Sequence, residues 1–494
     1  MRNIILLIGV TCALMFCTGF DERVKQPYII EDIQTPENLT AEVAALEFLP
    51  DGRLVAAFMR GEIMIYDPKK LEWKMFANGL HEPLGMLVVN KNEILVMQLP
   101  ELTRVKDTDG DGIADLYETV YDGFGMTGNY HEFTYGPVKD KKGNLYIGLN
   151  SSSSGGGIAN EIRGELNMDG KSKQGRAMFS VVPYRGWIMK LTPDGKVIPF
   201  ASGFRSPNGL MLDDKDNLFV TDNQGDWVAS SPLYHVREGQ FYGHPAALVW
   251  DKNWKKGNPF EWSRDSLDNL RDKPAVIFPH DVIANSPTQP VMIREGMNMD
   301  HFKGQLIVGE MNTERLVRVM LDEVDGVVQG AVTLFIEGKG LRKGNNRLAI
   351  APDGSLWVGQ TDHGWLGDRG IQKITASSKI AFDVKNIKLA KQGFELDFTA
   401  PFSVSKKGDI SSLVTVKKYK YHYHEKYGSP RINEENVAIK GVKTAAENSK
   451  MTLNIGKLEA GFVYEIKIDS MLSKGLQDTL TNKVIAYTVK KTKD

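Results

Sequence analysis

The chain has 494 residues and a formal net charge of -1, with 61 Lys and Arg against 62 Asp and Glu. Hydrophobic residues make up 41% and charged residues 25%. This composition excludes a disordered chain, a coiled coil, a multi-span membrane protein and the uniformly basic surface of a nucleic-acid-binding protein. Both cysteines, Cys12 and Cys17, precede residue 20, so the body of the chain has no disulfide, thiolate metal site or cysteine nucleophile.

The N-terminus has the pattern of a bacterial export signal. Arg2 precedes an apolar run over 4–16, which has the length of a signal-peptide core and is too short for a stable membrane span. Residues 1–20 therefore predict a signal peptide and a periplasmic protein. The segment 14–17 is similar to a lipobox, which leaves two outcomes open: acylation of Cys17 and attachment to the outer membrane, or cleavage near Gly19 and a soluble product.

A turn followed by a short alternating strand recurs along the chain. Gly, Asn and Asp in the turns supply the positive φ of tight hairpins, and the apolar period of two packs one sheet face on its neighbour. Six repeats of one turn favour propeller blades over a pair of β-sandwiches. The sequence predicts an all-β fold with a six-bladed β-propeller over 25–384. The copies lie at 50–55, 91–96, 142–147, 216–220, 303–308 and 352–358.

The sharpest local motif is an acidic loop at 107–118. Acidic side chains occupy positions 1, 3, 5, 9 and 12, and a glycine at position 6 allows a sharp bend. This pattern supplies the oxygen ligands of a calcium ion, without the flanking helices of a true EF-hand. We expect a structural calcium site formed by Asp107, Asp109, Asp111, the carbonyl of Ile113, Asp115 and Glu118.

Two glycine-bounded segments carry candidate catalytic residues. The first, 128–137, contains His131, and the second, 203–210, contains Arg205 and leads to the polar run 222–226. In a propeller, the loops before the innermost strands open onto the central channel. We therefore expect His131 and Arg205, from adjacent blades, to face one cavity.

The composition changes after about residue 385. Lysine becomes frequent, and the alternating segments 393–398 and 462–468 replace the repeated hairpins. Residues 385–494 therefore predict a small C-terminal β-sandwich of the immunoglobulin-like kind. His422 and His424 give only two possible metal ligands, so an edge strand explains them better than a metal site.

The segments around His131 and Arg205 resemble those of the soluble glucose and sorbosone dehydrogenases, β-propellers that use pyrroloquinoline quinone (PQQ). The resemblance covers about residues 40–380 and extends to bacterial propellers of the "membrane-bound dehydrogenase" type. It implies an oxidoreductase that transfers a hydride from a sugar or alcohol carbon to PQQ. His131 would be the general base on the substrate hydroxyl, and Arg205 would stabilise negative charge on the quinone oxygen.

The same resemblance implies a set of cofactor-binding residues and a calcium ion near 222–225. The family usually has an acidic residue before the histidine, where this chain has Tyr130, and many relatives carry a Cys-x-x-Cys-His haem motif that is missing here. Two alternatives follow: a separate external electron acceptor is used, or the redox role has been lost. The implied cofactor-binding residues are Asn208, Asp222, Asn223, Gln224, Arg315, Asn346, Arg347 and Asp362.

Two other functions remain open from the sequence. The segment 207–210 with Asp222 also resembles gluconolactonase-like propellers, in which Asn208, Asp222 and either Glu47 or Glu310 would hold a metal that activates water. The third possibility is a non-catalytic propeller that binds a glycan or a protein, with the C-terminal sandwich as a docking module.

Overall fold

The computed structural model describes residues 26–175, 177–364, 366–404, 410–469, 471–475 and 478–493. The predicted signal segment 1–20, with Cys17, lies outside the described residues. Antiparallel strands dominate the chain, so the predicted all-β class is confirmed. No helix in the described part is long and apolar enough to cross a bilayer. The described helices are short: η1 (Met168–Gly170), η2 (Pro245–Trp250), η3 (Pro259–Glu261), α2 (Arg264–Leu270), η4 (Asp300–Phe302) and η5 (Ile410–Leu413).

Among the described residues, six groups of four antiparallel strands follow one another along the chain. In chain order, the first three groups are β2 (Val43–Phe48), β3 (Leu54–Phe58), β4 (Ile63–Asp67) and β5 (Glu72–Ala77); β6 (Gly85–Asn90), β7 (Glu93–Gln98), β8 (Glu101–Lys106) and β9 (Leu116–Tyr121); and β10 (Thr134–Lys139), β11 (Leu145–Leu149), β14 (Trp187–Leu191) and β15 (Val197–Ser202). The other three are β16 (Gly209–Leu212), β17 (Leu218–Thr221), β18 (Pro232–Val236) and β19 (Val276–Ile277); β20 (Pro287–Met292), β21 (Leu306–Glu310), β22 (Arg315–Val324) and β23 (Val327–Glu337); and β24 (Asn345–Ile350), β25 (Leu356–Gln360), β26 (Gly370–Ala376) and β1 (Tyr28–Ile33).

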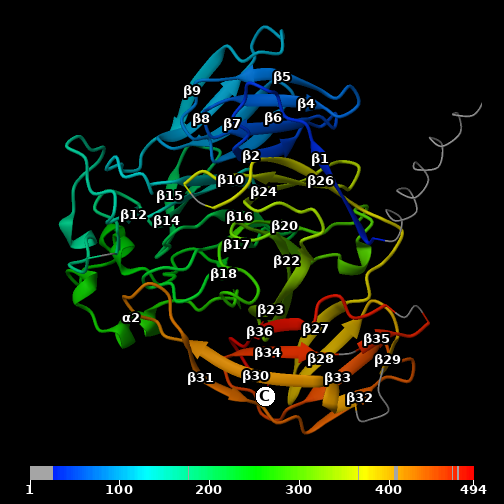
Figure 1. Ribbon diagram of the computed structural model, residues 1–494. Coiled ribbons are helices and arrows are strands. Elements are labelled where there is room, and N and C mark those ends of the chain that lie inside the picture. The colour runs from blue at the N-terminus through cyan, green and yellow to red at the C-terminus, as the bar shows by residue number, and fades with distance from the viewer. Residues whose placement is uncertain are drawn as a thin grey trace, which may run out of the picture.

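These sheets form a closed ring (Figure 1). The first strand of each group contacts the first strand of the next, from β2 through β6, β10, β16 and β20 to β24, and β24 contacts β2. The N-terminal strand β1 completes the last sheet, with Tyr28 opposite Ala376 and Ile33 opposite Ile371 of β26. The two ends of the ring are therefore held together by backbone hydrogen bonds between the beginning and the end of the predicted propeller segment.

The repeated turns have one structural role. Each of them connects the first and second strands of a sheet, as at 50–53 between β2 and β3 and at 140–144 between β10 and β11. Gly52 and Gly143 adopt φ angles of 91° and 85°, a left-handed conformation that glycine accepts at little cost. Because these turns are local, their sequence pattern identified them without knowledge of the ring.

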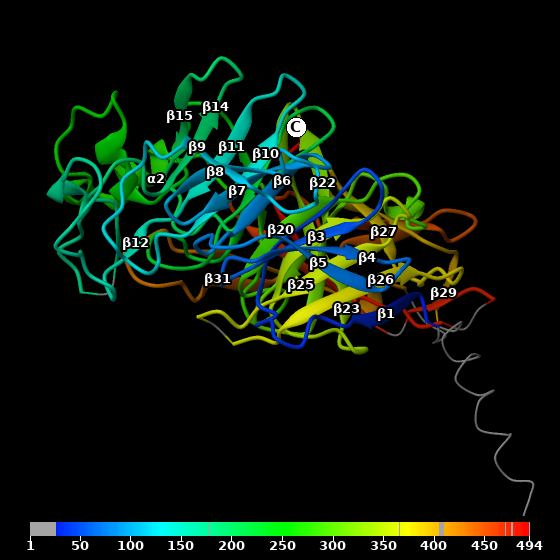
Figure 2. The ribbon, with the colours of Figure 1, turned by 90° about the horizontal axis from the view of Figure 1, so that it is seen from above.

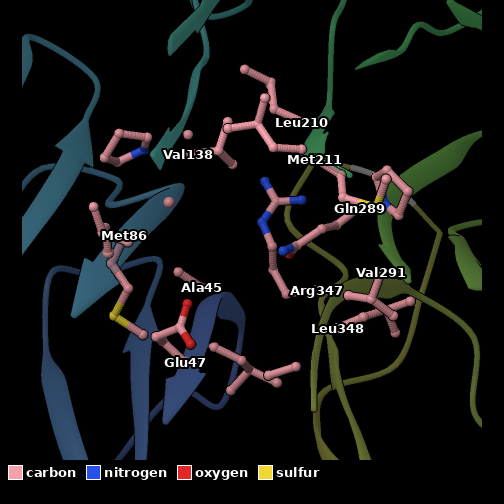
Figure 3. A pocket seen from close by; sticks show the side chains of 18 of the residues that line it. Ala45, Glu47, Met86, Val138, Leu210, Met211, Gln289, Val291, Arg347 and Leu348 are labelled. Atoms are coloured by element: carbon pink, nitrogen blue, oxygen red, sulfur yellow. The ribbon is translucent and has the colours of Figure 1, made fainter. Parts of the chain in front are cut away.

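The first strands line a central channel that contains a cavity of about 310 Å³ (Figure 3). Its walls come from the middle and later residues of each first strand, among them Glu47, Met86, Val138, Met211 and Val291. Arg347 projects into the centre of this view, between β24 and the strands across the channel. His131 and Arg205 precede the first residues of β10 and β16, so they lie toward the opposite end of the channel from this cavity.

Two insertions extend the ring on one side. The first contains β12 (Ser152–Ser153), η1 and β13 (Met178–Phe179), and the second contains η2, η3 and α2. Helix η1 contacts η2 and η3, so the two insertions pack on each other. Figures 1 and 2 both place β12 and α2 at the same edge of the molecule. Both insertions adjoin the segments that carry His131 and Arg205: Asn129 donates to the Ser153 carbonyl of the first, and the His244 N–H of the second donates to the Gly203 carbonyl.

The strands after residue 383 form two layers. One is a separate sheet, and the other extends the β20–β23 sheet beyond β23, so that eight strands are continuous. The small pair β29 (Phe402–Val404) and β35 (Met471–Ser473) lies beside them. The separate sheet has the order β27 (Val384–Ala390), β28 (Gly393–Phe398), β33 (Lys450–Asn454) and β32 (Gly441–Thr444), and the extension has the order β36 (Val484–Thr488), β34 (Val463–Ile468), β30 (Val414–Tyr421) and β31 (Arg431–Asn436).

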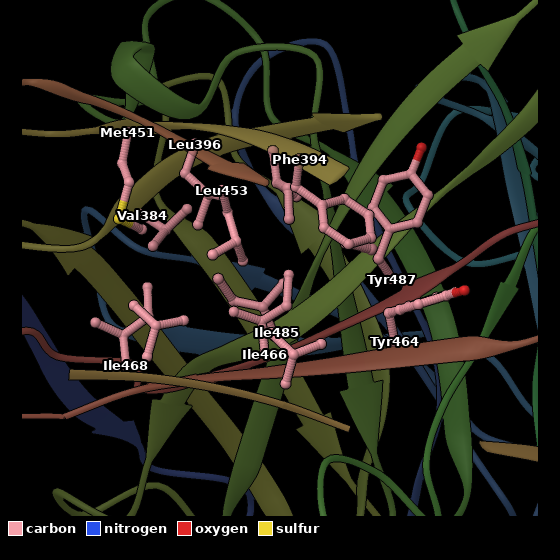
Figure 4. Close-up of a cluster of buried hydrophobic side chains, with 14 of the residues drawn as sticks. Val384, Phe394, Leu396, Met451, Leu453, Tyr464, Ile466, Ile468, Ile485 and Tyr487 are labelled. Atoms are coloured by element: carbon pink, nitrogen blue, oxygen red, sulfur yellow. The ribbon is translucent and has the colours of Figure 1, made fainter. Parts of the chain in front are cut away.

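A single hydrophobic core lies between these layers (Figure 4). Phe394, Leu396 and Leu453 from one sheet meet Ile466 and Tyr487 from the other. The cluster also contains buried residues of β22 and β23, which belong to the ring. The C-terminal layers and the ring therefore share both a sheet and a core.

A buried ion pair fixes the junction where the chain leaves the ring. The Arg318 side chain of β22 lies 3.1 Å from Asp383, with side-chain exposures of 0% and 3%. Arg318 also donates to the Val384 carbonyl at 2.7 Å, and Asn482 donates to Asp383 at 2.8 Å. Three separate parts of the chain thus supply partners to these two buried charges, although Arg318 Nε has no hydrogen-bond partner among the described residues.

Asp383→Ala is expected to lower the free energy of unfolding by about 3–5 kcal/mol, because it leaves the buried Arg318 without its carboxylate. The control Asp397→Ala removes an exposed ion pair with Lys450, at 3.5 Å, and should cost less than about 1 kcal/mol. Urea unfolding followed by tryptophan fluorescence measures both. Equal losses in the two variants would contradict the structural role of the Arg318–Asp383 pair.

Candidate functional site

The loop that carries His131 is held by its own polar side chains. The Asn129 amide oxygen accepts from the His131 and Ser153 backbone N–H groups, both at 3.0 Å, and its nitrogen donates to the Ser153 and Gly157 carbonyls. The fully buried Glu132 carboxylate accepts from the Thr127 backbone and hydroxyl and from Ser152. These bonds fix the backbone on both sides of His131 without an acidic residue before it.

The buried side chain of Arg185 also holds this loop in place. Arg185 donates to the Glu132 carbonyl at 2.8 Å and to the Gly125 carbonyl at 2.8 Å, and its Nε lies 3.9 Å from a Glu132 carboxylate oxygen. Burial lowers the pKa of Arg185 to about 10, while Glu132 raises it. The guanidinium is therefore charged at neutral pH and lies beside the Glu132 carboxylate. These contacts hold the loop in a fixed position.

The imidazole of His131 has one defined partner. Its Nδ1 lies 3.0 Å from the Ser151 carbonyl oxygen. A carbonyl only accepts hydrogen bonds, so Nδ1 carries the proton and Nε2 keeps a lone pair in the neutral ring. Burial, followed by the nearby positive charge of Arg205, lowers the pKa of His131 to about 4. The ring is thus neutral at pH 7, with Nε2 available to accept a proton.

Asp222 organises the turn that carries Arg205. This fully buried carboxylate accepts from the backbone N–H groups of Arg205 at 2.9 Å, Ser206 at 2.6 Å and Asn223 at 2.9 Å. Burial raises the pKa of Asp222, and these bonds partly offset that effect. The Ser151 backbone N–H donates to the Arg205 carbonyl at 3.0 Å. Ser151 therefore contacts both segments, so the segments that carry His131 and Arg205 lie next to each other.

Asp226 and His244 are members of this cluster that the sequence did not single out as site residues. The Asp226 carboxylate bonds His244 Nε2 at 3.0 Å and the Met178 N–H at 2.8 Å, and lies 3.9 Å from Arg205 Nε. Burial raises the pKa of Asp226, but His244 and Arg205 outweigh that effect and lower it overall. Asp226 ends the polar run 222–226, which was the available signal.

Arg347 and Asn208 bond to each other inside the channel. Arg347 Nη1 donates to the Asn208 side-chain oxygen at 2.8 Å and to the Asn346 side-chain oxygen at 3.0 Å, and its Nε and Nη2 donate to carbonyls at 44 and 84. Its guanidinium lies 5.0 Å from the centre of the Tyr135 ring. Burial lowers the pKa of Arg347 to about 10, so the group stays charged. Three predicted cofactor-binding residues, Asn208, Asn346 and Arg347, thus form a hydrogen-bonded cluster inside the channel.

The remaining predicted cofactor-binding residues divide into two sets. Asn223 and Gln224 lie beside Asp222, and Gln224 Nε2 donates to the Ala229 carbonyl at 3.1 Å. Arg315 and Asp362 lie elsewhere and are engaged with neighbours. Arg315 Nε donates to Glu337 at 2.6 Å, and Arg369 donates to Asp362 at 2.6 Å.

The residues of the alternative lactonase-like metal site have hydrogen-bond partners or surroundings of their own. Asp222 accepts three backbone N–H groups, and Glu310 accepts from the backbone of Asn285 and Ser286. Glu47 lies in the channel cavity, where burial raises its pKa. Within the described residues, the one group of three or more carboxylate, histidine or cysteine ligands that is close enough for a metal ion lies in the acidic loop.

The acidic loop forms a compact turn between β8 and β9. One side-chain oxygen each of Asp107, Asp109 and Asp111 lies within 4.8 Å of the others. Asp107 accepts from the Gly110 and Gly112 N–H groups, and Asp111 accepts from the Ile113 N–H at 2.8 Å. Asp115 accepts from the Thr108 hydroxyl and backbone, which lowers its pKa.

Glu118 has a partner outside the loop. It lies on β9 directly opposite Arg104 of β8 and forms an ion pair with it. The strand register therefore explains where this carboxylate lies, and the three aspartates 107, 109 and 111 form the close-packed part of the predicted ligand set.

Similar folds occur among solved structures of low sequence identity. The PQQ domain of a pyranose dehydrogenase from Coprinopsis cinerea is 12% identical, with a TM-score of 0.50 over 70% of this chain and 95% of that chain. A PQQ-bound aldose sugar dehydrogenase from Streptomyces coelicolor is 19% identical, with a TM-score of 0.47 over 70% of this chain and 98% of that chain. At 12% identity, the likeness to the pyranose dehydrogenase domain shows a propeller-like fold alone. No curated protein matches the sequence.

A family model matches residues 66–362, which include the acidic loop, both candidate catalytic segments and Arg347. This region is more than half of the chain. The chain therefore belongs to the family described as "Domain of unknown function (DUF7133)".

Proposed function

We propose that this chain is an exported six-bladed β-propeller with a C-terminal β-sandwich, and that it oxidises a hydroxyl group of a sugar or alcohol with PQQ as cofactor. The observation that carries the proposal is the pairing of a neutral His131, with Nε2 free to accept a proton, and the cation of Arg205. The six sheets around one channel support the architecture. The PQQ-binding proteins among the similar structures support the choice of cofactor.

His131 has the properties of a general base. Its protonated Nδ1 is bonded to the Ser151 carbonyl, so the ring cannot rotate freely and Nε2 has a fixed direction. A substrate hydroxyl within hydrogen-bonding distance of Nε2 would lose its proton to this atom as the carbon–hydrogen bond is broken. The low pKa keeps the base unprotonated, although it also makes the imidazole a weaker base than an exposed one.

Arg205 supplies the matching positive charge. Its side chain is only 11% exposed, and the nearest carboxylate oxygen, on Asp226, lies 3.9 Å from Nε, beyond hydrogen-bonding distance. A guanidinium held in surroundings that are poor in water stabilises developing negative charge more strongly than one in bulk solvent. Arg205 would thus bind an anionic or quinone oxygen next to the base.

The residues around this pair have unfilled hydrogen-bonding capacity that fits a polar cofactor. Arg205 Nε, Asn150 Oδ1 and Asn223 Oδ1 are buried and have no hydrogen-bond partner among the described residues. Buried polar atoms normally have partners, so unpaired ones mark places for a ligand. These three residues would hold PQQ, which when bound supplies the two-electron acceptor for the hydride. The hydrogen-bonded cluster of Arg347 and Asn208 would lie deeper in the channel than these residues and support them structurally.

We further propose that the acidic loop binds calcium through Asp107, Asp109 and Asp111. Three carboxylates this close repel one another, and a divalent cation removes that repulsion. The loop joins the outer strands of its sheet, so the ion would stabilise the fold and take no part in oxidation.

Wild-type protein is expected to bind PQQ saturably and to reduce a dye acceptor with an aldose. His131→Ala should keep PQQ binding and lower kcat by about 10²- to 10⁴-fold, since it removes the base. Arg205→Ala should weaken PQQ binding. His301→Ala is the matched control, because His301 lies in η4, between β20 and β21 of a different sheet from those that carry His131 and Arg205. Absorbance titrations and dye-coupled assays measure these effects, and an unchanged kcat in His131→Ala would refute the base.

The pH profile of kcat/KM distinguishes the buried base from an ordinary histidine. Because the pKa of His131 is lowered to about 4, the base is active above that pH and is lost only as the pH falls through about 4. The profile should therefore be flat between about pH 5.5 and 8 for this group. Arg205→Gln removes a charge that lowers the His131 pKa, so its inflection should move upward. An inflection near 6.5 in the wild type would contradict this environment for His131.

Calcium is expected to raise the free energy of unfolding of the wild type by about 2.7 kcal/mol when free calcium is 100 times the dissociation constant. The thermal unfolding midpoint should therefore rise. The double variant Asp109→Asn and Asp111→Asn should lose most of this shift. Asp122→Asn, an exposed acidic residue after β9, is the control. Calorimetric titration gives the affinities. The site is wrong if the double variant and the wild type respond equally to calcium.

A further inference from the structure

The loop between β30 and β31 reaches from the C-terminal layers to the candidate site. Residues 424–429 run beside the segment 225–229, which follows Asp222. The Gly428 N–H donates to the Gly225 carbonyl at 3.0 Å, the Ser429 N–H to the Ala229 carbonyl at 2.9 Å, and the Trp227 N–H to the His424 carbonyl at 2.9 Å. Asp226 and Tyr427 form an antiparallel bridge. The two segments are thus paired like short strands.

Side chains fix this loop in place. The Tyr423 hydroxyl donates to the Gly243 carbonyl at 2.5 Å, and the Tyr423 ring lies 5.1 Å from the Trp227 ring and 4.4 Å from the Arg271 guanidinium. Within the loop, His424 Nε2 lies 2.9 Å from the Gly428 carbonyl oxygen. These backbone and side-chain contacts together determine where Tyr427 lies.

Tyr427 covers the guanidinium of Arg205. The centre of the Tyr427 ring is 5.5 Å from Arg205 Cζ, and the tyrosine is 61% exposed whereas the Arg205 side chain is 11% exposed. Gly225 touches the same group, because a Cβ at this position would come within 1.8 Å of Arg205 Nε. The described residues provide no hydrogen bond to Arg205 Nε. Packing against Gly225 and the tyrosine ring therefore orients the cation.

We infer that Tyr427 is a positioning residue for Arg205, and that the C-terminal layers complete the candidate site through it. The inference rests on the proposed function of the His131–Arg205 pair. A guanidinium stacked on an aromatic ring keeps its plane while its N–H groups remain free to bind a ligand at the edge. Tyr130, 62% exposed and perpendicular to the His131 ring at 6.0 Å, forms an exposed aromatic neighbour of the base.

The test uses the full-length protein and compares Tyr427→Ala with Tyr427→Phe. The phenylalanine keeps the ring and should retain near wild-type PQQ affinity and kcat, whereas the alanine should lower kcat/KM by about 2- to 30-fold, the range of a cation–π contact. Met75→Ala, which truncates an exposed side chain on the outer strand β5, is the control and should change neither. Equal losses in Tyr427→Phe and Tyr427→Ala would overturn the role of the ring.

A double-mutant cycle tests whether Tyr427 acts through Arg205. In an Arg205→Ala background, Tyr427→Ala should have no further effect on PQQ affinity, and the same non-additivity should appear in the thermal midpoints of the PQQ-free proteins. Additive effects in both measurements would overturn the inference. If the midpoints are coupled but neither His131→Ala nor Arg205→Ala alters PQQ binding or dye reduction, the positioning contact stands and the proposed function fails.

Discussion

The pairing of β36 with β23 is the constraint on which the arrangement of the candidate site depends. Gly330 opposes Thr488 and Thr333 opposes Ile485, so the last strand of the chain continues a sheet of the ring. An outer edge strand normally exposes unpaired backbone groups and invites association with other chains. Here that edge is covered within the molecule. Because the pairing is antiparallel and in register, it also fixes the direction in which the other C-terminal strands run.

The core and the polar contacts follow from that pairing. With β36 fixed, β34 and β30 extend the same sheet, and their inner faces pack on β27, β28 and β33 in the shared core (Figure 4). The buried Arg318–Asp383 pair holds the other side of the junction. The loop after β30 is then carried back to Gly225 beside Arg205. An appended pair of sheets thereby gains a rigid connection to the channel rim, which a flexible linker would not provide.

The sequence predicted the local features of this structure better than the distant ones. The hairpin turns and the acidic loop are encoded within a few residues by Gly, Asn and Asp, so the all-β class and the close approach of Asp107, Asp109 and Asp111 were predictable. The proximity of the segments with His131 and Arg205 was expected because each segment precedes the first strand of one of two adjacent sheets. Tyr427 comes from a distant part of the sequence and His244 is linked to Arg205 through Asp226, so only the folded chain shows these neighbours of the cation.

The contrast between local and distant features also explains why several residues that were expected to bind the cofactor have another role. Asn208, Asn346 and Arg347 occupy positions in or just before the first strands of their sheets, as a channel site requires. A buried guanidinium needs many acceptors, however, and Arg347 finds them in the backbone carbonyls and amide oxygens of three neighbouring sheets. Arg347 and Asn208 therefore line the channel cavity, and Arg347 projects into it (Figure 3).

The position of Arg205 then determines the chemistry at the rim in two ways. Its charge is the second cause, after burial, of the low pKa of His131, while Asp226 acts in the opposite direction. Moving the guanidinium away from the imidazole would therefore raise the His131 pKa and, under the proposed function, would also withdraw the positive charge from the quinone oxygen. The proposed function thus requires a fixed position of the cation relative to His131. Gly225 and Tyr427, one from the ring and one from the C-terminal layers, are the contacts that hold the cation in that position.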